Sequence, residues 1–102
     1  MTKHYRQANA IVARQIGDEM ALVPVRQNVG DLENLYTLNA TGAALWRQLS
    51  EPRTQEELTL FLVTEFEVMP NQAGADVQAF LTELAQLNLT EESPWQTPMT
   101  AS

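Results

Sequence analysis

The residue types that carry most enzyme chemistry are scarce in this sequence. It contains no Cys and a single His, His4, near the N-terminus. Thiolate zinc sites, disulfides and Cys nucleophiles are therefore excluded. Adjacent acids occur at 18–19, 56–57 and 91–92, but neighbouring residues on a helix point in different directions and do not share a site. The four glycines are isolated, so no phosphate-binding loop is present. We predict no catalytic residues, no metal site, no cofactor and no enzymatic activity.

The distribution of charge along the chain is uneven. All six Lys and Arg residues lie in the first 53 positions, beside five acids, which gives this part a net charge of +1. From Thr54 onward eight acids and no basic residue give −8. Nucleic acids and anionic membranes bind proteins through cations, so neither is an expected partner. The polar N-terminal residues lack the apolar run of a signal peptide, and no stretch could span a bilayer, which favours a cytoplasmic location.

Hydrophobic patterning predicts one domain over residues 11–89, between a flexible N-terminal arm (1–10) and a disordered tail (90–102). Three strands are expected first. Residues 11–16 form a β-branched run that ends at the turn signal Gly17-Asp18. A second run covers 20–25 and contains Pro24, which cannot donate to a neighbouring strand. The third strand is expected over 32–38.

Three amphipathic helices are expected to follow. Asn39 or Thr41 can cap the first, which ends near residues 51–52. Thr54 and Glu57 form a capping box at the start of the second. Apolar residues at spacings of three and four place the third between about Ala73 and Leu87, and Asn88 suits the left-handed position after it. Strands followed by helices indicate an α+β fold, here a winged-helix-like one with a three-stranded antiparallel sheet and three helices.

Two features of these elements bear on function. Trp46, on the first helix, is expected in the core. The third strand lies at an edge of a three-stranded sheet and carries neither Lys nor Pro, the residues that usually protect edges. It is therefore open to docking by another strand.

Several segments of the sequence resemble one known family. They are Leu38-Asn-Ala-Thr-Gly-Ala-Ala-Leu-Trp46, Pro52-Arg-Thr-Gln-Glu-Glu-Leu58, Asp76-Val-Gln-Ala-Phe-Leu-Thr-Glu-Leu84 and Leu87-Asn-Leu89. In this order and spacing they resemble the family of the pyrroloquinoline quinone synthesis protein D (PqqD), over about residues 11–89. The sequence departs from the family pattern at 51–52 and at Asn88, where glycine is usual. The polar tail has no general counterpart in the family.

The resemblance implies a function as well as a fold. Proteins of this family bind the leader of a ribosomally made precursor peptide and present the peptide to a modifying enzyme, commonly a radical S-adenosylmethionine (SAM) protein. The leader adds as a strand to the third strand and lies in the groove beside the third helix. Transferred here, the pairing residues would be Leu32, Glu33, Asn34, Leu35, Tyr36 and Thr37. The groove wall would be formed by Asp76, Ala79, Phe80 and Glu83.

Some alternatives stay open at this point. Asp76 and Glu83 lie two turns apart along one helical face and could pair with Lys or Arg of a leader. Equally, Asp76 could simply favour the start of its helix by its charge. A second interpretation is a winged-helix DNA-binding regulator. The second and third helices, however, lack the Lys and Arg residues that contact DNA. A structural subunit of an enzyme complex is another interpretation, and exposed strand edges would permit a homodimer.

Overall fold

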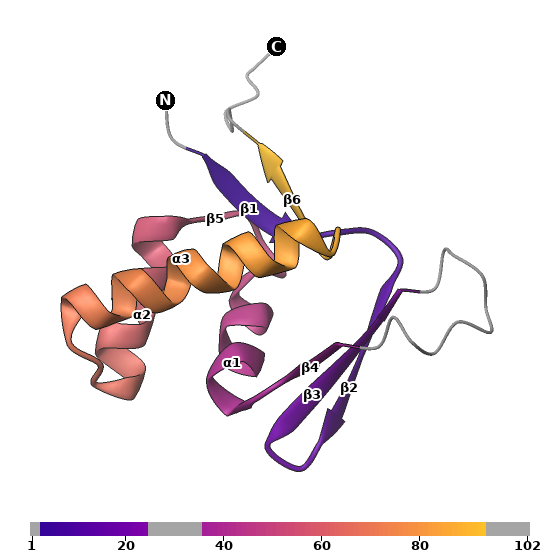
Figure 1. Cartoon of the computed structure of the whole chain (residues 1–102), viewed down its shortest axis with the longest axis horizontal. Coiled ribbons are helices and arrows are strands. Elements are labelled where there is room, and N and C mark those ends of the chain that lie inside the picture. The colour runs from indigo at the N-terminus through magenta and orange to yellow at the C-terminus, as the bar shows by residue number, and fades with distance from the viewer. Residues whose placement is uncertain (1–2, 25–35, 94–102) are drawn as a thin grey trace.

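The computed structural model describes residues 3–24 and 36–93. Its elements form two small antiparallel sheets and three helices (Figure 1). In chain order they are β1 (His4–Gln7), β2 (Ile11–Ile16), β3 (Glu19–Pro24), β4 (Tyr36–Leu38), α1 (Ala40–Gln48), β5 (Arg53–Thr54), α2 (Gln55–Phe66), α3 (Pro70–Gln86) and β6 (Thr90–Ser93). The α+β class and the sheet that precedes three helices are confirmed.

The first sheet has the order β2-β3-β4. Strands β2 and β3 form a hairpin whose turn contains Gly17 at φ +62°, a conformation that favours glycine. On the central strand β3, Met20 and Leu22 face inward and pair with Leu38 and Tyr36 of β4. The predicted third strand is therefore present at residues 36–38, while its residues 32–35 lie outside the described part of the chain.

The helices begin where local side chains satisfy their free amides. The Asn39 side chain accepts a hydrogen bond from the Gly42 amide at 2.8 Å, and Thr54 and Glu57 form the predicted capping box. Helix α3 begins at Pro70, earlier than predicted, because the fixed φ of proline suits the first turn of a helix. After α3, Asn88 adopts the expected left-handed conformation with φ 61°.

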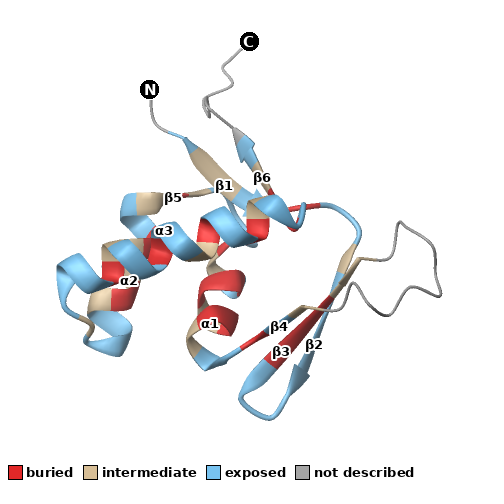
Figure 2. Cartoon of the chain, viewed as in Figure 1, coloured by how far each residue is buried: buried red, intermediate tan, exposed pale blue. Residues whose placement is uncertain are grey.

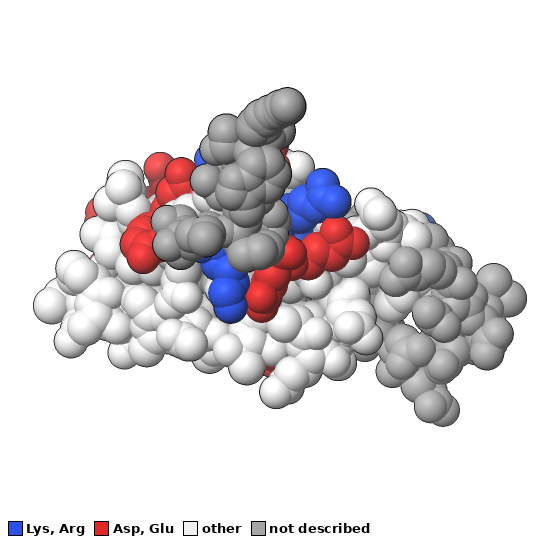
Figure 3. Space-filling view, turned by 90° about the horizontal axis from the view of Figure 1, so that it is seen from above, with Lys and Arg blue, Asp and Glu red and all other residues white. Residues whose placement is uncertain are grey.

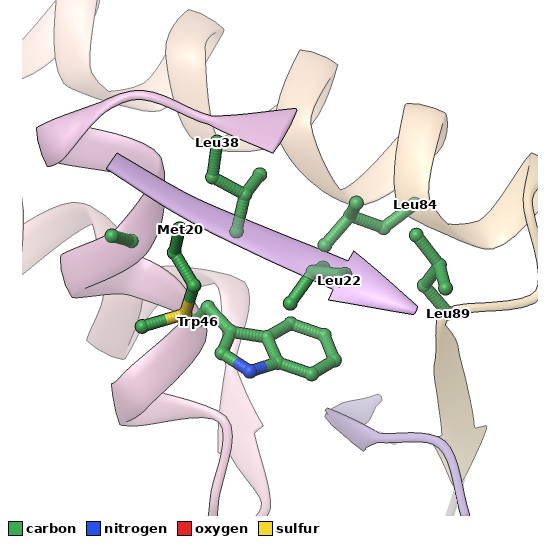
Figure 4. Close-up of a cluster of buried hydrophobic side chains, with 7 residues drawn as sticks. Met20, Leu22, Leu38, Trp46, Leu84 and Leu89 are labelled. Atoms are coloured by element: carbon green, nitrogen blue, oxygen red, sulfur yellow. The ribbon is translucent and has the colours of Figure 1, made fainter. Parts of the chain in front are cut away.

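The core consists of two apolar clusters that share α1 and α3 (Figure 2). The first joins the β2-β3-β4 sheet to these helices, and its side chains converge around Trp46 (Figure 4). The second lies among α1, α2 and α3. Phe80 of α3 packs against both clusters. Trp46 is 3% exposed and so belongs to the core as predicted, whereas Leu87, expected in the apolar stripe of α3, is 46% exposed.

The second sheet, with order β5-β1-β6, differs from the sequence-based expectation. Residues 4–7 were expected in a flexible arm and residues 90–93 in a disordered tail, but they form β1 and β6. Strand β1 pairs with both β5 and β6. These segments lack apolar alternation, so only pairing between distant parts of the chain defines them as strands.

Side-chain and backbone contacts attach β1 to the core. The backbone N–H of Gln7 donates a hydrogen bond to the Leu49 carbonyl at 2.9 Å. The side-chain amide of Gln7 donates a second one to the Trp46 carbonyl at 2.8 Å. Tyr5 packs against the second cluster. On the outer surface, Lys3 and Arg6 form ion pairs with Glu92 and Glu91 at 3.4 and 3.1 Å. Figure 3 shows basic and acidic side chains gathered together on this face of the molecule.

We predict that deletion of residues 1–7 destabilises the domain. The deletion removes the hydrogen bonds of β1 and the packing of Tyr5, so the free energy of unfolding should fall by about 3 kcal/mol. The matched control is R6Q, which breaks only an exposed ion pair and should cost less than about 1 kcal/mol. Urea denaturation measures both. Equal stability of the deleted and full-length chains would contradict a structural role for β1.

Candidate functional site

Strand β4 lies at one of the two edges of its sheet. One side of its backbone pairs with β3, in the register Met20↔Leu38, Ala21↔Thr37 and Leu22↔Tyr36. Within residues 3–24 and 36–93, no strand pairs with its other side. An unpaired edge presents backbone N–H and C=O groups that can accept a further strand. This side of β4 is therefore able to bind an extended chain.

The opposite edge of the sheet, on β2, has different surroundings. Most of β2 is exposed, including Val12 at 43% and Ile16 at 62%. By contrast, Tyr36 and Leu38 of β4 belong to the same apolar cluster as Phe80 and Leu84 of α3. Of the two edges of this sheet, the one on β4 thus offers the more apolar contacts with a neighbouring helix, within the residues that the structure describes. A strand needs side-chain contacts as well as backbone hydrogen bonds to bind in one register, so β4 is the better candidate.

The space between β4 and α3 has an apolar floor. Leu38 and Leu84 are buried, and Tyr36 and Phe80 are half-buried beside them. Side chains of this kind can bury the alternate residues of an added strand. We call β4 and the facing side of α3, from Phe80 to Leu87, the β4–α3 groove.

A polar contact crosses this groove. The Tyr36 hydroxyl lies close enough to the carboxylate of Glu83, an exposed residue of α3, for the two groups to interact. Burial, as the largest cause, and the neighbouring Glu83 carboxylate together raise the pKa of Tyr36 from 10.0 to about 12. The hydroxyl therefore stays protonated well above neutral pH, and Glu83 is held beside the edge strand.

The predicted site residues are only partly brought together. Tyr36, Phe80 and Glu83 lie around the groove. Thr37 is exposed on the other face of β4, as the alternation of a strand requires. The Asp76 carboxylate accepts a hydrogen bond from the Gln72 side chain at 2.8 Å, within α3.

The remaining predicted residues have no recorded role in the groove. Ala79 is exposed on α3. Leu32, Glu33, Asn34 and Leu35 lie outside the described residues.

Two groove residues were missed as site candidates. Leu84 is buried in the first cluster, and Leu87, the residue after the last one of α3, is exposed. Both follow Phe80 at helical spacing, so the periodicity predicted that they share its side of the helix. It could not distinguish a buried residue from an exposed one on that side.

The arrangement has the character of a binding surface. Within the described ranges, no group of three His, Cys, Asp or Glu residues could hold a metal ion. In the same part of the chain, no helix has the length and apolar character needed to cross a membrane. The β4–α3 groove instead offers backbone hydrogen bonds, an apolar floor and one carboxylate, which together suit an extended peptide.

We predict a pH dependence of stability that comes from Tyr36. Between pH 10 and 12 the unfolded chain loses the phenol proton while the folded chain keeps it. The stabilisation is therefore complete below pH 10 and decreases as the pH rises towards 12. The difference in urea midpoint between wild type and Y36F, followed across this range, measures the effect. Parallel curves for the two proteins would contradict it.

Comparisons with known proteins agree with this geometry. The family model described as "Coenzyme PQQ synthesis protein D (PqqD)" matches residues 19–89. This range includes β3, β4 and all three helices. A search of curated proteins finds no significant match.

A solved structure is also similar to this chain. It is TbiB1 in complex with the TbiA(beta) leader peptide, which superposes with a TM-score of 0.70 at 27% sequence identity. The alignment covers 84% of this chain and 94% of TbiB1. Since the family model covers most of the sequence, and the fold agrees with a structural neighbour, the chain belongs to the PqqD family.

Proposed function

We propose that this protein is a peptide-binding adaptor. It binds the leader of a ribosomally made precursor peptide by strand addition to β4 and presents the peptide to a modifying enzyme. The observation that carries the proposal is the unpaired edge of β4 beside α3. Membership of the PqqD family supports it, as does the likeness to a protein solved with a leader peptide.

The chemistry of the groove fits this function. Hydrogen bonds from the edge of β4 give affinity for any extended chain, and side-chain contacts give register and selectivity. Tyr36 and Phe80, which are half-buried, supply apolar surface for alternate residues of the leader. Residues 32–35, which the sequence predicts to continue this strand, would lengthen the paired edge. Asp76 and Ala79 would extend the wall along α3.

The proposal includes partners beyond the leader. The modifying enzyme is expected to be a radical SAM protein, as is common in the family, and the complex to act in the cytoplasm. The adaptor itself contributes no catalytic group. A homodimer through a free strand edge is a separate prediction, which sedimentation measurements can test.

DNA binding finds no support in the composition of the helices. Phosphate contacts and guanine recognition depend mostly on Lys and Arg. Helices α2 and α3 contain neither residue. A winged-helix-like fold without these cations lacks the means to bind DNA in the usual way.

We predict that N-methylation distinguishes strand addition from other binding modes. In an added strand, only alternate N–H groups point at the neighbouring strand. The probe is the leader of the precursor peptide encoded beside this gene. It is synthesised in two versions, or registers, with N-methyl groups on the odd-numbered residues in one and on the even-numbered residues in the other. The version in which the N–H groups that face β4 are methylated should not bind. The other version should bind nearly as well as the unmodified peptide, as measured by calorimetry.

Chemical-shift perturbation locates the binding site in the same system. Addition of the unmodified leader should shift the amides of residues 36–38 and the signals of Phe80 and Glu83. Amides of α2 around Leu60 serve as an internal control, because α2 packs in the second apolar cluster whereas β4 belongs to the first. Equal loss of affinity in both methylated registers, or shifts confined to other surfaces, would contradict strand addition to β4.

A further inference from the structure

A single acidic residue stands between two apolar ones along the β4–α3 groove. Phe80, Glu83 and Leu87 follow one another at spacings of three and four, so they lie on one side of α3. Phe80 is half-buried, Glu83 is exposed and Leu87 is 46% exposed. The sequence of properties along the groove is therefore apolar, acidic, apolar.

Glu83 is held in place from the other side of the groove. Its carboxylate lies close enough to the Tyr36 hydroxyl of β4 to affect the pKa of that hydroxyl. A carboxylate has two oxygens and can accept several hydrogen bonds, so this contact leaves capacity for a ligand. The contact with Tyr36 restricts the rotamers of the Glu83 side chain. A ligand that binds Glu83 therefore costs less side-chain conformational entropy.

No cation of the described chain neutralises Glu83. The ion pairs recorded over residues 3–24 and 36–93 join Lys3 to Glu92, Arg6 to Glu91 and Arg53 to Glu51. From Thr54 onward the chain contains no Lys or Arg, so α2 and α3 offer no partner of their own. A complementary charge would have to come from elsewhere, and a strand added to β4 would pass beside Glu83.

We propose that Glu83 selects leaders that carry a Lys or Arg facing the groove, with apolar residues two positions away on either side. This inference rests on the proposed function and specifies the chemistry of the peptide. The rise of α3 from Phe80 to Leu87 is about 10.5 Å. In an extended strand, the first and third of three alternate residues lie about 13 Å apart. Long side chains can make up the difference between this distance and the rise along α3. Tyr36 is the positioning residue for Glu83.

A selection with random peptides tests the inference without a known leader. Twelve-residue peptides displayed on phage are selected against wild type, against E83Q and against E65Q. The matched control, Glu65, is exposed on α2, and E65Q changes the net charge by the same amount. Peptides from wild type and E65Q should be enriched in a basic residue between alternate apolar residues, and peptides from E83Q should lack this basic residue.

A double-mutant cycle then measures the contact. The most enriched peptide and its Lys→Gln version (or Arg→Gln) are titrated into wild type and E83Q. Loss of the basic residue should weaken binding to wild type by about two- to fivefold, as expected for a partly exposed ion pair, and should leave binding to E83Q unchanged. Y36F should reduce this preference for the basic peptide while affinity for the Gln peptide is kept, which a purely structural role would not produce.

The outcomes separate the two proposals. Selected peptides that shift residues 36–38 but show no basic enrichment, or the same enrichment with E83Q, would overturn this inference and leave the adaptor function intact. If no selected peptide shifts residues 36–38, the adaptor function itself fails, and this inference fails with it. Circular dichroism and thermal melts establish that E83Q and Y36F are folded.

Discussion

The packing of the β2-β3-β4 sheet against α3 is the interaction on which the rest of the structure depends. Leu22 and Leu38 meet Leu84 around the indole of Trp46, and all four are almost completely buried (Figure 4). Removal of such side chains from a packed core costs several kcal/mol. The cluster fixes how far α3 lies from the outer strand. It thereby places α3 beside the edge of β4 with which no strand pairs in the described part of the chain.

A free strand edge is normally a liability, because it invites aggregation. Here the risk is limited by geometry. Strand β4 ends at Leu38, and α1 begins almost at once, at Ala40. Gly42 in the first turn of α1 allows this sharp transition, since a Cβ there would lie 3.3 Å from the Leu38 side chain. An edge beside a helix favours a ligand with matching side chains over indiscriminate pairing.

The structure shows where the unevenly distributed charges of the chain lie. Basic residues near the N-terminus meet acidic residues of β6, so opposite ends of the chain attract one another on the surface of the second sheet. The acids of α3 are not used in this way within the described residues. Glu83 is instead oriented by Tyr36 beside the open edge. Helices α2 and α3 thus carry no Lys or Arg, and the acid Glu83 lies beside the edge strand.

Local patterns were enough to predict much of this protein. The hairpin of β2 and β3, the caps at Asn39 and Thr54, and the burial of Trp46 depend on neighbouring residues, and all are visible in the sequence. The family segments, which share those local patterns, also indicated the groove-forming elements. The start of α3 was placed a few residues too late, because the helical periodicity begins after the capping proline.

Only the tertiary structure decided which distant residues meet. The polar segments of β1 and β6 become strands because His4 pairs with Thr54 and with Ser93, contacts that no local period can reveal. The same holds for the exposure of Leu87 and for the proximity of Tyr36 and Glu83. Residue spacing determines which side of an element a side chain occupies. What that side faces depends on the packing of the whole chain, and the groove is a product of that packing.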